Sequence, residues 1–137
     1  MLALGALGCA KFQTARECGT FVEAIKAWKA QAPKAAASAP PALPSSTGAA
    51  SVEALALAER YDDLARRIDS LHLTSAELLP RATRYQKLSR EAAAALRDVA
   101  DAVSKGDAER ARKRRVEFDD LANGEGPLVA DINRLCR

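Results

Sequence analysis

The chain has 137 residues, a length that suits one domain with its own core and is short for two. Its formal net charge is +3 with 28% charged residues, which indicates a well-solvated surface and excludes the strongly basic character of a dedicated nucleic-acid protein. Hydrophobic residues make up 48%, largely alanine, and aromatic residues only 4%. Alanine with leucine, glutamate, lysine and arginine favours helices, and no alternating run of β-branched residues occurs, so the composition predicts an all-α protein.

Residues 1–9 form a short apolar run that ends in Gly8-Cys9. This run resembles the end of a bacterial lipoprotein signal peptide, in which the cysteine becomes the lipidated first residue. The resemblance implies a lipid anchor on Cys9 and a helical domain over 10–137. No positive charge precedes the run, and Ala6 stands where lipoproteins usually carry leucine. The alternative is an Ala/Leu-rich helix start with a buried free thiol.

The first predicted helix covers about residues 12–31, because its apolar positions recur at helical spacing. These positions are Cys18, Phe21, Val22, Ile25 and Trp28. Residues 32–50 are rich in proline, alanine and serine, and proline at this density ends a helix. We expect a flexible linker there, longer than the usual join between bundle helices.

The second predicted helix runs from Ser51, as N-cap, to about His72. Its packing seam is Leu57, Tyr61, Leu64, Ile68 and Leu71. His72 is the only histidine, and we expect it to be solvated at the helix C-terminus. From this count we expect neither a multi-histidine metal site nor a histidine-based catalytic triad.

The third predicted helix starts with a capping box, with Thr74 as N-cap and Glu77 at the N3 position. It continues to about Ser104, and Pro80 is expected to distort or restart its first turn. Its apolar face carries Leu78, Ala82, Tyr85, Leu88, Ala92, Leu96, Val99 and Val103.

Gly106 and Asp107 mark the next turn, the glycine suiting a position after a helix end and the aspartate an N-cap. The fourth predicted helix covers about 108–136. Asn123-Gly124 and Gly126-Pro127 predict a kink or two helical pieces. Its apolar face carries Ala111, Phe118, Leu121, Leu128, Ile132 and Leu135.

Three cysteines occur in the chain. If Cys9 is lipidated, Cys18 and Cys136 remain as an even pair on the apolar faces of the first and last helices. An up-down-up-down four-helix bundle places these two positions at the same end. We therefore predict a Cys18–Cys136 disulfide, stabilising by roughly 4–5 kcal/mol through loop closure. The alternative is two buried reduced cysteines.

One basic cluster stands out, comprising Arg110, Arg112, Lys113, Arg114 and Arg115. It is either a solvated helix face paired with neighbouring acids or a surface that binds anionic lipid headgroups, envelope polysaccharide or an acidic protein. Nucleic acid fits less well, because no interleaved aromatic side chains offer stacking. The aspartates at 62, 63, 69, 98 and 101 fall on polar faces, and no Glu-x-x-His or Cys-x-x-Cys occurs. We expect no enzymatic activity, cofactor, metal or small-molecule substrate.

In layout the chain resembles small uncharacterised helical lipoproteins of the envelope of myxobacteria and their relatives. The matching features are Leu7-Gly8-Cys9, Cys18, the Ala/Pro-rich linker, the turn at Leu73–Glu77, the Gly106-Asp107 break and the closing Ile132–Cys136. The resemblance implies a lipid-anchored protein of the periplasm or outer membrane. We expect a structural or protein-interaction module there. The alternatives are a cytoplasmic helical adaptor or weak nucleic-acid binder using Arg110–Arg115, and carriage of a ligand in the bundle interior.

Overall fold

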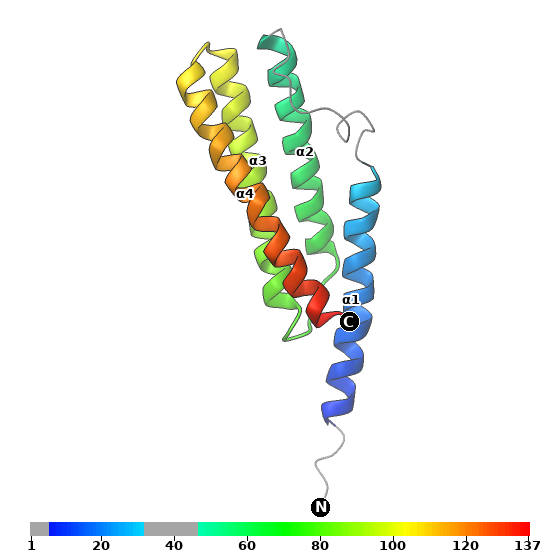
Figure 1. Cartoon of the computed structure of the whole chain (residues 1–137). Coiled ribbons are helices and arrows are strands. Elements are labelled where there is room, and N and C mark those ends of the chain that lie inside the picture. Colours follow the sequence, from blue (N-terminus) through cyan, green and yellow to red (C-terminus); the bar gives the residue numbers. More distant parts are fainter. Residues whose placement is uncertain (1–5, 32–46) are drawn as a thin grey trace, which may run out of the picture.

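The protein is an up-down-up-down bundle of four α-helices (Figure 1). The computed structural model describes residues 6–31 and 47–137, with side chains for 10–31 and 48–137. These parts of the chain contain no strand, and the all-α four-helix prediction is confirmed. The helices are α1 (Ala6–Ala30), α2 (Thr47–Ser70), α3 (Leu79–Ser104) and α4 (Ala108–Leu135). The predicted linker lies outside the described residues as far as 46, and its last residues, 47–50, belong to α2.

The start of α2 differs from the prediction that Ser51 caps it. The helix begins at Thr47, one turn earlier, in a stretch with two alanines that favour helix. Ser51 therefore lies inside α2, and its hydroxyl donates to the Ala100 carbonyl oxygen of α3 at 3.3 Å. A tertiary hydrogen bond thus takes the place of the predicted cap.

The predicted capping box at Thr74 is wrong, because α3 begins at Leu79. A tight turn precedes the helix, in which the buried Ser75 accepts the Leu78 backbone N–H on its hydroxyl at 3.2 Å. Pro80 lies in the first turn, where a missing backbone N–H costs no intrahelical hydrogen bond. It therefore starts α3 instead of distorting it.

The turn between α3 and α4 follows the prediction. Gly106 has a φ of 70°, a left-handed conformation that glycine adopts without strain. Asp107 is the N-cap of α4, and its carboxylate accepts the Arg110 backbone N–H at 3.0 Å.

Helix α4 is continuous through Pro127, so the alternative of two helical pieces is wrong. Proline in a helix interior removes one backbone hydrogen bond. The turns that follow it carry Leu128 and Ile132, which are 8% and 3% exposed. Burial of these side chains compensates for the break in the hydrogen-bond ladder and keeps the helix in one piece.

Aromatic side chains from all four helices meet in the core. Trp28 and Tyr61 have ring centroids 5.7 Å apart, and Tyr61 meets Phe118 edge-on at 5.8 Å. Phe21 meets Tyr85 edge-on at 6.2 Å. These residues belong to the predicted apolar faces of their helices.

Helix α1 is the most loosely attached of the four. Its Cα atoms come within 8 Å of those of α2 but not of α3 or α4. Its attachment to the bundle therefore depends on side chains, chiefly Cys18, Phe21 and Trp28, which are all buried.

Candidate functional site

Helix α1 meets the turn between α2 and α3 and the end of α4 at one end of the bundle, which we call the anchor end. Here Cys18 is joined to Cys136 by a disulfide, with the two Cα atoms 5.5 Å apart and a sequence separation of 118. The predicted pairing is confirmed. Cys9 lies further toward the N-terminus of α1, and its side chain lies outside the described residues. The first turns of α1 extend beyond the rest of the bundle at this end (Figure 1).

Glu17 ties α1 to the turn between α2 and α3. Its carboxylate accepts the backbone N–H of Thr74 at 3.0 Å, the Thr74 hydroxyl at 2.7 Å and the backbone N–H of Ser75 at 2.8 Å. Gln13 donates to the same carboxylate at 3.1 Å, and Thr14 shares a hydrogen bond with the Ser75 hydroxyl at 2.8 Å. Thr74 is therefore engaged by α1, which is the physical reason that it does not cap α3.

These hydrogen bonds set the charge state of Glu17. Desolvation by neighbouring atoms acts to raise its pKa, but the donors on Ser75, Thr74 and Gln13 outweigh it and lower the pKa from 4.5 to about 2. The carboxylate is ionised at every ordinary pH. Sequence periodicity does not identify this role of Glu17, because its partners in the turn lie 57 and 58 residues away.

A second polar group lies within the core. Tyr85, only 1% exposed, donates its hydroxyl to the carboxylate of Glu125, and Lys29 lies 3.6 Å from that carboxylate. Burial, and then the hydrogen bond to Glu125, raise the pKa of Tyr85. Sequence reasoning missed this group, although Glu125 falls at helical spacing between Leu121 and Leu128 on the predicted apolar face.

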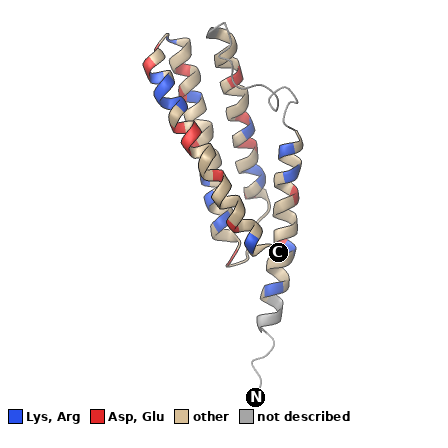
Figure 2. Ribbon diagram, viewed as in Figure 1, with Lys and Arg blue, Asp and Glu red and all other residues tan. Residues whose placement is uncertain are grey.

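The basic cluster lies at the other end of the bundle, at the start of α4 (Figure 2). Arg110 pairs with Asp101 of α3 at 2.9 Å, and Arg114 pairs with Asp98 of α3 at 3.2 Å. Arg115 pairs with Asp119 at 3.3 Å. Hydrogen bonds from Lys105 and Arg110 lower the pKa of Asp101. Much of the predicted cluster is thus engaged in ion pairs with acids of α3 and α4.

Two members of the cluster differ from the others. Arg112 and Lys113 are exposed, and neither is in an ion pair within the part of the chain that the structure describes. The nearby Asp107 pairs with neither of them, and its carboxylate accepts the Arg110 backbone N–H as the N-cap of α4. These two side chains are the part of the cluster that is open to an anionic partner.

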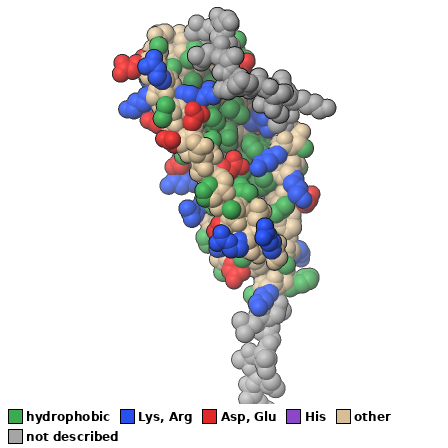
Figure 3. Space-filling model, in the orientation of Figure 1, with side chains coloured by type: hydrophobic (Ala, Val, Ile, Leu, Met, Phe, Trp, Pro, Cys, Tyr) green, Lys and Arg blue, Asp and Glu red, His purple; other side chains and the backbone are tan. Residues whose placement is uncertain are grey.

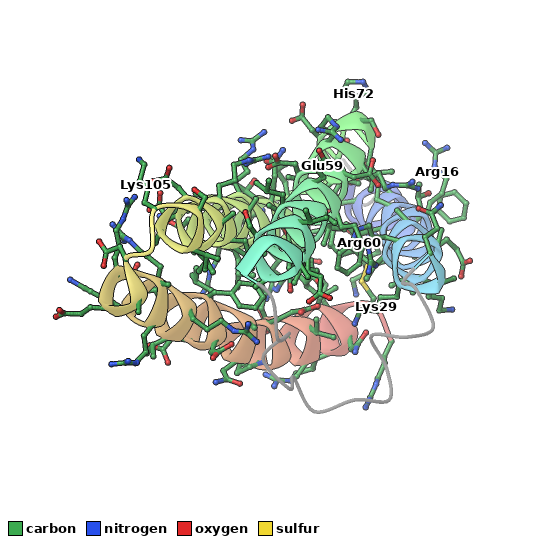
Figure 4. All side chains as sticks on the ribbon, turned by 90° about the horizontal axis from the view of Figure 1, so that it is seen from above. Arg16, Lys29, Glu59, Arg60, His72 and Lys105 are labelled. Atoms are coloured by element: carbon green, nitrogen blue, oxygen red, sulfur yellow. A yellow bond between two sulfur atoms is a disulfide. The ribbon has the colours of Figure 1, made fainter. Side chains whose placement is uncertain are left out.

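His72 is exposed, as predicted for a solvated residue, and Figure 4 shows it pointing away from the bundle. Its φ is 48°, a left-handed conformation after the end of α2. A shallow groove of about 250 Å³ lies beside it, between α2 and α3. Among the described residues, no group of histidine, cysteine, aspartate and glutamate side chains could hold a metal ion. Within the same residues, no helix has the length and apolar character needed to cross a bilayer.

No protein-family model, curated protein or solved structure matches the chain at a significant level.

Proposed function

We propose that the protein is a lipid-anchored helical bundle of the bacterial envelope, tethered through Cys9, and that it acts as a non-enzymatic structural or protein-interaction module. The observation that carries this proposal is the Cys18–Cys136 disulfide. Disulfides persist in oxidising compartments such as the periplasm and are rare in the cytosol. The bond uses two of the three cysteines and leaves Cys9, in the lipoprotein-like Leu7-Gly8-Cys9 run, available for lipidation.

The position of Cys9 in the fold supports this reading. It lies in the first turn of α1, the helix that extends beyond the bundle at the anchor end (Figure 1). A lipid attached here would leave the packed part of the bundle free of the bilayer. Cleavage before Cys9 would remove only the first three residues of α1.

The two unpaired cations of α4 lie at the end of the bundle opposite Cys9. Arg112 and Lys113 lie 24 and 23 residues before Cys136 along the chain, which corresponds to about 35 Å along a helix. A bundle tethered through Cys9, at the opposite end, presents these two cations away from the bilayer. We propose that they face an acidic protein or an anionic envelope polymer.

The competing reading is a cytoplasmic adaptor or weak nucleic-acid binder that uses Arg110–Arg115. The ion pairs of Arg110 and Arg114 with acids of α3 weaken it, since a polyanion would have to displace these carboxylates. Two unpaired cations neutralise few phosphates and give a weak, strongly salt-dependent affinity.

The two readings are separated by expression of the full chain with its native upstream region in a bacterial host, followed by membrane fractionation and intact-mass measurement. We expect a diacyl or triacyl addition on Cys9 and recovery in the membrane fraction. Cys9→Ser should be unacylated and released from the membrane. Cys18→Ala is the matched control, because it removes another cysteine of the same helix and should leave acylation intact. An unmodified, uncleaved wild-type N-terminus would overturn the proposal.

A further inference from the structure

The anchor end carries an exposed aromatic residue between two cations. Phe12 is 74% exposed, the highest value among the large exposed hydrophobic residues, while the other five aromatic side chains are buried. Lys11 and Arg16 are exposed, and no ion pair involves either of them in the described part of the chain. Figure 4 shows Arg16 projecting outward from α1. An exposed phenyl ring with flanking cations suits a membrane interface, where the ring can insert at the acyl boundary and the cations can bind headgroup phosphates.

The disulfide brings further positive charge to the same end. Arg134 and Arg137 flank Cys136, which is bonded to Cys18 of α1, and both are exposed. Figure 3 shows basic side chains on the lower part of the molecule, where α4 ends beside α1, as well as over the rest of this face.

The acids of the anchor end offset part of this charge. Asp131 is paired with Arg81 at 2.7 Å. Glu17 stays ionised, because its hydrogen-bond donors are neutral groups. Asp69 and Glu77 are exposed, and neither is in an ion pair in the described part of the chain. The anchor end therefore presents Lys11, Arg16, Arg134 and Arg137 against the carboxylates of Glu17, Asp69 and Glu77.

We propose that the anchor end is a second membrane contact, which docks on an anionic phospholipid surface with Phe12 inserted at the interface and Lys11 and Arg16 on the headgroup phosphates. The inference rests on the proposed function, because lipidation of Cys9 would place this end of the bundle at the bilayer. Charge complementarity and the single exposed aromatic residue carry it. A lipid chain and a basic patch together supply the two signals that stable anchoring requires.

The test uses the full chain with Cys9→Ser, which cannot be lipidated, and co-sedimentation with vesicles of phosphatidylcholine alone or mixed with phosphatidylglycerol. We expect binding to the mixed vesicles that falls as salt is raised. Lys11→Glu with Arg16→Glu should weaken it roughly tenfold or more, because each cation near an anionic surface contributes a factor of about five. Phe12→Ala should weaken it roughly fivefold or more, because it removes the inserted ring.

Matched controls come from the far end of the bundle. Arg112→Glu with Lys113→Glu makes the same charge change on exposed residues of α4, and Val52→Ala removes an apolar side chain that is 66% exposed on α2. Both controls should bind the vesicles as the parent does. Equal loss of vesicle binding in the test and control variants would overturn the proposal, because it would show that the vesicles attract positive charge at either end of the bundle. Loss confined to the Arg112 and Lys113 variant would overturn it too, by placing the lipid contact at the far end.

A depth measurement tests insertion directly. Phe12→Trp in vesicles with brominated acyl chains should be quenched, whereas Trp28, 7% exposed and 16 residues further along α1, should not. The parent chain, with Trp28 alone, gives the baseline for this comparison. Absence of quenching at position 12 in bound protein would overturn the insertion of Phe12.

Failure here and failure of the proposed function are distinguishable. Acylation of Cys9 without vesicle binding by the unlipidated chain would keep the lipid anchor and reject this second contact. Vesicle binding by the Cys9→Ser chain together with an unmodified Cys9 in the native host would keep the lipid-binding end and reject the lipoprotein proposal.

Discussion

At the scale of single residues, Glu17 of α1 acts as a capping residue for the turn between α2 and α3. The turn between α2 and α3 exposes backbone N–H groups at Thr74 and Ser75, and the Glu17 carboxylate of α1 accepts both. A carboxylate that accepts several donors is held in its ionised form. The same contacts therefore attach α1 to the bundle and make that attachment dependent on pH.

We expect Glu17→Gln to lower the free energy of unfolding by about 1–2 kcal/mol at pH 7, because charge-assisted hydrogen bonds become neutral ones on a partly exposed group. The pKa of Glu17 is about 2 in the folded protein, below the ordinary value of 4.5 for a glutamate side chain. A lowered folded-state pKa gives stability that is fully present above 4.5 and is lost as the pH falls toward 2. Urea unfolding at pH 7, 5, 4 and 3 measures this.

Glu23→Gln is the control for this pH series. Glu23 lies on the same helix and pairs only with the exposed Lys26 at 3.1 Å, so its loss should change stability by less than about 0.5 kcal/mol. The wild type and Glu23→Gln should lose stability in parallel below pH 5, and Glu17→Gln should lose less. Parallel curves for all three proteins would contradict the role given to Glu17.

His72 holds a left-handed backbone conformation that costs a residue with a Cβ atom roughly 1 kcal/mol. We expect His72→Gly to raise the free energy of unfolding by up to about 1 kcal/mol, because glycine adopts this φ without a steric penalty. His72→Ala retains the Cβ atom and separates this effect from loss of the imidazole. Thermal unfolding of the three proteins measures it, and a glycine variant no more stable than the alanine variant would disprove the prediction.

At the scale of elements, α4 keeps its helical path through Pro127 at an energetic cost. The proline removes a backbone hydrogen bond in the helix interior, and its side chain is exposed, so it contributes no buried packing. Stability of the last turns of α4 then depends on Leu128 and Ile132 and on the disulfide at Cys136.

Pro127→Ala should raise the free energy of unfolding by about 1–3 kcal/mol, since it restores the backbone donor and adds a good helix former. Gly126→Ala gives a smaller gain of about 0.5–1 kcal/mol, because a Cβ atom there meets nothing within 4 Å. Denaturant unfolding of both variants checks that Pro127→Ala gains more stability than Gly126→Ala. A destabilised Pro127→Ala would show that the proline is needed for the path of α4.

The elements also show which signals the sequence carries. The turn at Gly106 and Asp107 was predictable, because its glycine and its cap act on residues no more than three positions away. The capping box at Thr74 uses equally local rules, yet it is wrong, because Glu17 competes for Thr74 from 57 residues away. Local capping signals are therefore reliable where no other helix reaches the turn.

At the scale of the whole molecule, the disulfide joins the most loosely packed helix to the end of the chain. The amphipathic faces and the parity of short turns were enough to predict the Cys18–Cys136 pairing and the order of the helices. The polar pairing around Glu125 was not predictable as a contact, since periodicity places a residue on a face and does not name its partner. The surface at the anchor end could not be predicted for the same reason, because it is formed by segments that are far apart in the sequence.

Replacing both Cys18 and Cys136 by alanine should lower the free energy of unfolding by roughly 3–5 kcal/mol, because the unfolded chain regains the entropy of a loop that spans most of the protein. Denaturant unfolding with and without reductant measures it, and reductant should leave the double variant unchanged. Thiol titration of the denatured, unreduced wild type should find only Cys9 or no thiol. Three reactive thiols would contradict the bond.

The disulfide also determines how the molecule would carry a mechanical load. A pull on Cys9 enters the bundle through nine residues of α1 and reaches Cys18, where the bond passes tension directly to Cys136. The chain from Cys18 to Cys136 is a closed ring that contains α2, α3 and α4, so tension between Cys9 and Arg137 bypasses all three helices. A tethered protein built this way would transmit force between its anchor and Arg137 without peeling α1 from α2. Reduction of one covalent bond would turn this stiff connection into one that unravels from α1.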